Sequence, residues 1–431
     1  MRTLLLVILF VPLFGIVNAQ SREDIRESFN EGEYFFVRGE YSEAAYYFRK
    51  VVDSYPNNSH YNFKLGECYM NIPGSEALAI PCFEKAAANT VEKNKYRSKD
   101  IDEINAPLHA WFYLGNVYRI NSRLEDALNA YVTFINAPFY YGNYNVNIVE
   151  NEIKSCERAK IIMDNPVDLV VEAMDTVINT LASELYPVVT ANEQTMVFVR
   201  KLKFYDAIFY ATKQGDSWSR PVNLNPLVGS DGDFYPVSLS PDGNELYLVK
   251  TTLENKDLYV SYRRNSTWTK AEPLNKNINT KADETWACIS SDGQTLWFSS
   301  SRKGGYGGLD LYYSRRDNSL QWGKARNAGN IINTPFDEES PCLTDNGQIL
   351  FFSSKGHYSM GGFDIFYTSK NGKAWKDPVN IGFPINNTSD NLGFSAAGNG
   401  STGYYSRINA SGEDSAEDIF RAVLKSNYPL P

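Results

Sequence analysis

The chain has 431 residues, which is long for one domain and suits two or three. Its net charge of −9 makes nucleic acid and anionic membrane surfaces unsuitable partners. The five cysteines are too few and too scattered for a disulfide scaffold, and they form neither a CxxC pair nor a metal-ligand spacing. We therefore expect a multidomain chain with no metal site and no cofactor.

Residues 1–19 have the pattern of a secretory signal peptide. Arg2 precedes an apolar run that extends from Leu4 to Val17, and Val17 and Ala19 place small residues at the −3 and −1 positions of a cleavage site. The run is too short to span a bilayer, and no later stretch of the chain reaches that length. No cysteine follows the cleavage site, so no lipid attachment is expected. The pattern predicts a soluble, exported protein.

Helical repeats are predicted over residues 20–165. The stretch WFYLGNVY at Trp111–Tyr118 matches the tetratricopeptide (TPR) pattern W-x2-L-G-x2-Y. The same frame fits twice earlier in the chain, around Gly32 and around Gly66. A final helix over about 147–163 would shield the last repeat from solvent. The pattern predicts an α-solenoid of three helix pairs.

Stacked helix pairs leave a concave face that is lined by the first helix of each pair. Equivalent positions of the three repeats give three levels of side chains on this face. One interpretation is a groove that binds a peptide or a partner helix. The other is that some of the phenylalanines belong to the core between repeats. The predicted groove residues are Phe29, Glu33, Phe36, Phe63, Glu67, Met70, Phe112, Asn116 and Arg119.

Residues 166–431 repeat with a period near 50. Asp-Gly and Asn-Gly turns between apolar runs recur at this period, and glycine accepts the positive φ that such hairpin turns demand. About four short strands in each unit predict a five-bladed β-propeller. The expected fold is therefore α plus all-β, a TPR solenoid followed by a propeller. An aspartate marks one strand of each unit: Asp206, Asp257, Asp310, Asp364 and Asp418.

The fifth unit stops before its outer strand. A segment ahead of the first unit, Pro166–Leu169, resembles the outer-strand segments Pro221–Leu224 and Pro378–Ile381 of other units. We predict that residues 166–171 complete the last blade and close the ring. Closure would remove exposed strand edges, which otherwise template aggregation.

Two glycine-rich stretches occupy the same place in adjacent units, SRKGGYGGLDLYYS at Ser301 and SKGHYSMGGFDIFYTS at Ser354. A phosphate-binding loop would need a helix directly after it, whereas both stretches run into β-branched and aromatic residues. One interpretation is that the glycines let the backbone turn between two strands. The other is that Tyr306, His357 and Tyr358 in these loops form a contact face.

An acid or amide stands at a fixed place before each predicted inner strand. A ring of such groups at the channel mouth could bind a cation or hydrolyse a glycoside, with Trp286 and Tyr235 as aromatic neighbours. Alternatively, each group caps its own turn by accepting backbone N–H bonds. One equivalent residue in every blade favours the structural role, and no catalytic signature stands out, so a non-enzyme without catalytic residues is expected. The predicted channel-mouth residues are Glu184, Asp233, Glu284, Glu338 and Asn391.

The stretches SSSRKGGYGGLDLYYS and SPDGNELYLV resemble the PD40 (WD40-like, TolB-like) repeats of envelope proteins. The order of signal peptide, TPR array and PD40 propeller resembles PorE-type components of type IX secretion, of the kind found in Bacteroidota. Those relatives usually continue into a carboxypeptidase-regulatory-like domain and an OmpA-like domain that binds peptidoglycan. Neither domain is recognised here, so direct peptidoglycan binding is not expected.

This resemblance implies a non-enzymatic scaffold or adaptor in the periplasm or at the outer membrane. Its partners would be proteins of the cell envelope, in type IX secretion or envelope assembly. The alternative is a propeller that binds or hydrolyses glycans.

Overall fold

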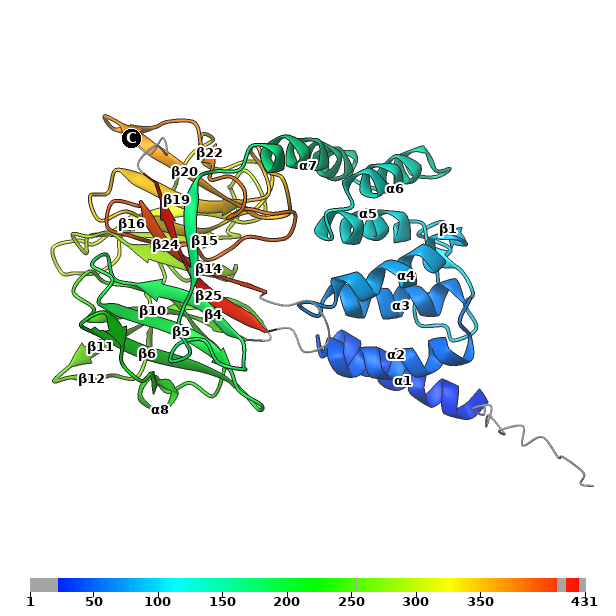
Figure 1. Ribbon diagram of the computed structural model, residues 1–431, viewed down its shortest axis with the longest axis horizontal. Helices are drawn as coiled ribbons and strands as arrows, with labels where there is room; N and C mark the ends of the chain where they lie inside the picture. Colours follow the sequence, from blue (N-terminus) through cyan, green and yellow to red (C-terminus); the bar gives the residue numbers. More distant parts are fainter. Residues whose placement is uncertain (1–21, 253, 409–415, 426–431) are drawn as a thin grey trace, which may run out of the picture.

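The computed structural model describes residues 22–252, 254–408 and 416–425. A stack of helices is followed by a five-bladed β-propeller (Figure 1), which confirms the predicted fold class. The predicted signal peptide lies outside the described residues. Within the described ranges, no helix is both long enough and apolar enough to cross a membrane.

The helical domain consists of three antiparallel helix pairs and a final helix. A short parallel ladder of β1 (Thr90–Val91) and β2 (Ala106–Pro107) lies between the second and third pairs. The helices are α1 (Arg22–Val37) with α2 (Tyr41–Ser54), α3 (Ser59–Met70) with α4 (Glu76–Ala87), α5 (Ala110–Ile120) with α6 (Leu124–Asn136), and the last helix α7 (Val146–Asp164).

A glycine on the first helix lets each pair pack closely. A Cβ built on Gly115 would lie 2.4 Å from the ring of Tyr131, which is fully buried on α6. Gly32 and Gly66 face the rings of Phe48 and Phe83 in the same way. The glycine and aromatic positions of the repeat pattern are therefore two sides of one contact.

Each propeller blade is a small antiparallel sheet, and its first strand lies innermost. The innermost strands are β4 (Glu184–Val189), β9 (Phe234–Leu239), β14 (Glu284–Ile289), β18 (Glu338–Leu343) and β23 (Ser395–Ala397). The second strands are β5 (Thr195–Lys201), β10 (Glu245–Thr251), β15 (Thr295–Ser300), β19 (Ile349–Ser354) and β24 (Thr402–Ile408). The third strands are β6 (Asp206–Gln214), β11 (Lys256–Arg264), β16 (Asp310–Arg315), β20 (Asp364–Asn371) and β25 (Glu417–Leu424).

Short strands form the outer edges of the first four blades, and the propeller core lies between adjacent blades. Val197 of β5 packs in one cluster with Leu248 of β10, for example. The outer strands are β7 (Ser217–Trp218), β8 (Val222–Asn223), β12 (Thr267–Trp268), β13 (Glu272–Pro273), β17 (Arg326–Asn327), β21 (Ala374–Trp375) and β22 (Val379–Asn380), and a short helix α8 (Asn225–Val228) follows β8.

The fifth blade takes its outer strand from the other end of the propeller sequence. Strand β3 (Leu169–Ala173) pairs antiparallel with β25, so that Val171 lies opposite Ala422. This pairing confirms the predicted closure of the ring. Because β3 follows α7 directly, the closing strand also fixes the point where the helical domain is attached (Figure 1).

We predict that Gly115→Ala destabilises the helical domain. Alanine favours the helix by about 0.5–1 kcal/mol over glycine, but its Cβ would clash with the buried Tyr131 ring, and overpacking costs about 1–3 kcal/mol. The measurement is the urea unfolding midpoint, with Glu27→Ala on the exposed face of α1 as the control. An unchanged or raised midpoint for Gly115→Ala would contradict the close contact.

Candidate functional site

The predicted channel-mouth glutamates are buried and bonded to their own turns. Glu184, Glu284 and Glu338 are fully buried at the starts of β4, β14 and β18. Each accepts hydrogen bonds from the backbone N–H and the hydroxyl of a threonine four residues earlier. For Glu284 these bonds from Thr280 measure 2.9 and 3.0 Å. The carboxylates cap turns and do not offer oxygens to an open channel.

Other side chains donate further hydrogen bonds to the carboxylates of these glutamates. Arg200 donates to Glu184 at 2.6 Å, and Arg302 donates to Glu284 at 3.1 Å. Among the described residues no arginine pairs with Glu338, which accepts from the hydroxyl of Ser354 at 2.7 Å, as Glu284 does from Ser300. Burial raises the pKa of Glu338 to about 8.

The other two predicted members of the ring differ from the glutamates. Asn391 accepts from the backbone N–H of Asn387 at 2.9 Å, which is again a turn cap. Asp233 is one residue out of register, because Phe234 stands opposite Lys250 where Glu184 stands opposite Arg200. Asp233 instead forms an ion pair with Lys250 at 3.0 Å. The expected ring of five equivalent oxygen-bearing side chains is therefore not formed.

Bulges in the inner strands direct other side chains into the channel. The pairing register shifts between Leu185 and Val188 in β4, and between Glu284 and Ala287 in β14. A β-bulge re-aims the side chains at the shift. Here it turns Tyr186, with a φ of 51°, and Trp286 inward.

A cavity of about 390 Å³ opens at this end of the channel. It lies on the side of the propeller that faces the helical domain, because Leu392 in its wall belongs to the loop whose Thr388 contacts α5. Its lining includes the aromatic side chains Tyr186, Tyr235 and Trp286, the acids Asp206 and Glu339, and the lysines Lys201 and Lys256. We call it the mouth cavity.

Two acids in the mouth cavity are held by neutral donors. The Tyr235 hydroxyl donates to Asp206 at 3.0 Å, and the Thr285 hydroxyl donates to Glu339 at 2.7 Å. Burial raises the pKa of Glu339 and raises that of Tyr186 to about 12. Trp286 and Tyr235 were predicted from the sequence as neighbours of the channel mouth, but neither acid was. Asp206 was predicted only as one of the recurring aspartates. The position of Glu339 depends on a bulge in β18, which has no signal in the sequence.

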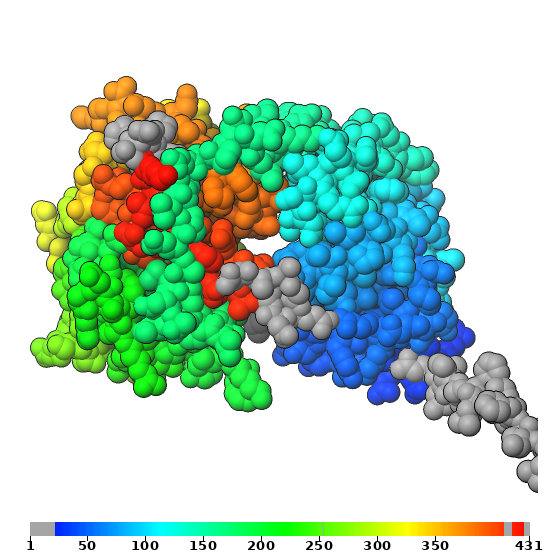
Figure 2. All heavy atoms as spheres, viewed as in Figure 1, coloured from blue at the N-terminus to red at the C-terminus, as the bar shows by residue number. Residues whose placement is uncertain are grey.

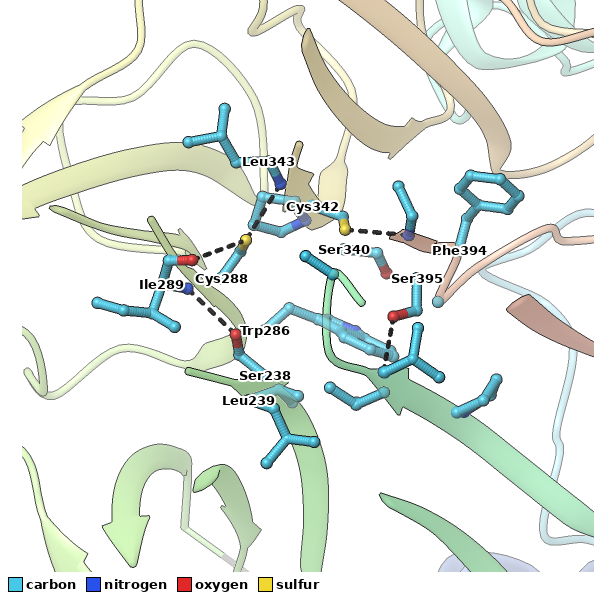
Figure 3. A pocket seen from close by; sticks show the side chains of 18 of the residues that line it. Ser238, Leu239, Trp286, Cys288, Ile289, Ser340, Cys342, Leu343, Phe394 and Ser395 are labelled. Atoms are coloured by element: carbon cyan, nitrogen blue, oxygen red, sulfur yellow. Dashed lines mark hydrogen bonds between the residues drawn. The ribbon is translucent and has the colours of Figure 1, made fainter. Parts of the chain in front are cut away.

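Below the aromatic side chains the channel narrows to a cavity of about 60 Å³, in which Trp286 extends across the centre (Figure 3). Side chains of the inner strands hold adjacent blades together here by accepting a backbone N–H of the next blade. Cys288 accepts from Leu343 at 3.1 Å, and Cys342 accepts from Ala396 at 3.3 Å (Figure 3). Serines do the same at two other blade junctions: Ser238 with Ile289, and Ser395 with Val189. The two cysteines are free thiols with a structural role.

The predicted TPR groove is largely occupied by the chain itself. Phe29 and Phe63 are buried in the core of the helical domain, as the core interpretation proposed for some of these phenylalanines. The inserted segment between β1 and β2 places Tyr96 against Phe63, with the ring centroids 5.9 Å apart. The Tyr96 hydroxyl also hydrogen-bonds to His60 at 2.8 Å.

Polar groove positions form contacts inside the domain. Glu33 pairs with Lys64 at 2.8 Å, and Asn116 accepts from the Tyr131 hydroxyl at 2.8 Å. Burial raises the pKa of Glu67 to about 7. The groove positions that stay half-buried are Glu33, Phe36, Glu67, Met70, Phe112 and Asn116.

Arg119, the last predicted groove residue, is buried where the two domains meet. Its guanidinium forms an ion pair with Glu152 of α7 at 3.0 Å and donates to the carbonyl of Thr388 in the propeller. The Thr388 hydroxyl donates in turn to the carbonyl of Ile120 at 3.1 Å. Arg119 therefore fixes one domain to the other.

Helix α7 packs on the second glycine-rich loop. Arg158 donates to the carbonyl of His357 at 2.9 Å, and its guanidinium carbon lies 4.9 Å from the ring centroid of Tyr358. The hydroxyls of Ser155 and Ser359 hydrogen-bond at 3.2 Å. This loop is thus a contact face, and the helix that it contacts belongs to the same chain.

The repeated glycines are explained by close approach of a neighbouring loop. A Cβ on Gly307 would lie 1.8 Å from the carbonyl oxygen of Phe336, and one on Gly361 would lie 2.6 Å from that of Asn387. Neither glycine has a positive φ. The requirement at these positions is therefore space more than an unusual backbone turn.

Comparisons with known proteins give distant structural likenesses only. No family model matches the chain, and no curated protein matches it. Among solved structures, TolB from Acinetobacter baumannii aligns at 17% identity and a TM-score of 0.38, covering 58% of this chain and 56% of TolB. The first TPR domain of human RPAP3 aligns at 19% identity and a TM-score of 0.26, covering 34% of this chain and 98% of that domain. A GH62 hydrolase in complex with xylotriose aligns at 12% identity and a TM-score of 0.38, covering 60% and 95%.

These likenesses are too distant to carry an argument about function. The function is therefore inferred from the residues of the chain itself.

We predict that Glu284→Gln destabilises the propeller more than Glu338→Gln does. Both changes keep the shape of the side chain, but only the first leaves a largely buried cation, Arg302, without its carboxylate. Breaking a buried pair in this way costs about 3–5 kcal/mol. The two free energies of unfolding, measured at pH 7, test this order. Equal losses would show that Arg302 does not depend on Glu284.

Glu338 should make stability fall as the pH rises. Its pKa is about 8 in the folded chain against an ordinary value of 4.5, so the folded state holds a proton that the unfolded chain releases in this window. The stabilising contribution is complete below about 4.5 and is lost as the pH rises to about 8. Unfolding curves at several pH values should show a smaller loss for Glu338→Gln than for the natural chain. If the free energy of unfolding changes with pH by the same amount in both proteins, the raised pKa of Glu338 is contradicted.

Proposed function

We propose that this protein is a non-enzymatic scaffold that binds protein partners. The observation that carries the proposal is the buried junction of Arg119, Glu152 and Thr388, which joins the two repeat domains into one body. Buried charged groups must be paired to be tolerated, so the junction favours one orientation of the domains. A fixed pair of large repeat surfaces suits simultaneous binding of more than one partner.

The proposed setting is the periplasm, with a peripheral association at the outer membrane, in type IX secretion or envelope assembly. This part is supported by the signal-peptide pattern of residues 1–19 and by the order of TPR array and PD40 propeller, which resembles PorE-type proteins. Partners would then be proteins of the cell envelope.

Two surfaces are available for such partners. One is the part of the helical groove that the inserted segment leaves open, around Phe36, Glu67 and Met70. The other surrounds the opening between the helical domain and the propeller (Figure 2). Glycoside hydrolysis is not proposed, because the predicted glutamates are bonded within their own turns.

Cross-linked affinity purification from whole envelopes tests the scaffold. The groove variant combines Phe36→Ala with Met70→Lys, both at half-buried positions, and the control is Tyr46→Ala on the exposed side of α2. We expect the natural chain and the control to recover the same envelope proteins. The groove variant should lose at least one of them while its circular dichroism and melting temperature stay close to those of the control.

If all three forms recover the same proteins, these partners do not bind at the groove. Recovery of no envelope protein by any form would overturn the scaffold.

A further inference from the structure

The aromatic rings of the mouth cavity form a corner that suits a small chemical group of a ligand. Tyr186 stands nearly perpendicular to Tyr235, at 87° with the ring centroids 6.0 Å apart, and to Trp286, at 78° and 5.6 Å. A flat sugar ring would stack on one open aromatic face, whereas these rings form a corner. The faces of aromatic rings carry negative charge density and attract cations.

Space for this corner depends on a residue of the fifth blade. Gly393 has a φ of 70°, and a Cβ built on it would lie 3.2 Å from the Trp286 ring. Tyr186 adopts a positive φ as well, which is unusual for a bulky side chain. Such strain is retained where the surrounding structure or a function demands it.

The acids of the cavity lack a cation. Among the described residues, no lysine or arginine nitrogen lies within 4.0 Å of the carboxylates of Asp206 or Glu339, whereas Glu184 and Glu284 each have an arginine. Glu339 is only 9% exposed, and its carboxylate accepts from the neutral hydroxyl of Thr285. A buried carboxylate without a cation is costly, so a bound cation would be favourable.

The lysines near the cavity act on its acids only from a distance. Lys201 and Lys256 line the cavity but are exposed, so their ammonium groups stay hydrated. Lys256 and Lys355 favour the charged form of Glu339 and Asp337 opposes it, but neither lysine lies within ion-pair distance of Glu339. Glu417 acts in the opposite direction, since it adds to the negative field that raises the pKa of Tyr186. The less exposed part of the cavity therefore remains acidic and aromatic.

We propose that the mouth cavity binds an organic ammonium group against Tyr186, Tyr235 and Trp286, with Asp206 and Glu339 as its counter-ions. A lysine side chain of a protein partner is one source of this group, and a free alkylamine is another. The assignment to a protein-borne lysine rests on the proposed scaffold function. The binding of an ammonium group does not.

Isothermal titration calorimetry on the full chain tests the site. The probes are Nα-acetyl-lysine N-methylamide, its Nε-acetylated and therefore neutral counterpart, n-butylamine, and chitotriose as a neutral saccharide. We expect saturable binding of the ammonium probes at pH 7 and at least tenfold weaker binding of the neutral counterpart. Glu339→Gln and Asp206→Asn should each weaken ammonium binding at least tenfold, and the control Glu272→Gln, exposed on β13, should leave it unchanged.

Each further outcome decides between the alternatives. The proposal is overturned if no ammonium probe binds, or if neither carboxylate variant weakens the binding. Preferential binding of chitotriose would also overturn it and would make the cavity a saccharide site. Tighter binding of the lysine probe than of n-butylamine supports a protein-borne lysine, whereas the reverse order overturns that source alone. Should Glu339→Gln fail to fold, Asp206→Asn carries the test. If the natural chain recovers envelope proteins but binds no ammonium probe, the ammonium site is overturned and the scaffold function is not.

Discussion

The pairing of β3 with β25 is the constraint on which the rest of the structure depends. It joins residues that are about 250 positions apart in the chain, and without it the fifth blade would have three strands and an exposed edge. The closing strand begins five residues after α7 ends at Asp164. Ring closure therefore fixes the end of α7 against the propeller, and the position of the whole helical stack follows from it.

Buried electrostatics then fix the orientation of the two domains. Arg119 is shared between Glu152 of α7 and the Thr388 carbonyl of the propeller, and burial raises the pKa of Glu152 despite its partner. Desolvation of such a pair offsets much of its attraction, so the pair contributes little net stability. Its effect is on specificity, because other docking positions would leave a buried charge without a partner.

Sequence reasoning succeeded where the signal is local. The glycine and aromatic positions of the three helix pairs report a contact that is repeated in each pair. The recurrence of an acid at one place in the repeat also led to the turn-cap interpretation, which the bonds of Glu184, Glu284 and Glu338 confirm.

Prediction failed where distant contacts decide. Tyr96 covers the groove because it packs against a helix more than thirty residues away, and no local pattern announces this. The register of Asp233 depends on the pairing of β9 with β10, so counting back from the predicted inner strand misplaced it by one residue. The bulges that turn Tyr186 and Trp286 into the channel likewise arise only when the inner strands pair with the second strands.

The departures from five-fold repetition are the informative part of the propeller. Residues that recur from blade to blade must satisfy the same backbone groups each time, as Glu184, Glu284 and Glu338 do in three blades. Residues that differ between blades are free of that requirement. Trp286 and Gly393 occupy equivalent places after the capping residues of their blades, yet one fills the channel and the other leaves room for it. Selective chemistry can be placed at such positions, because a side chain there does not have to bond the backbone groups of its own blade.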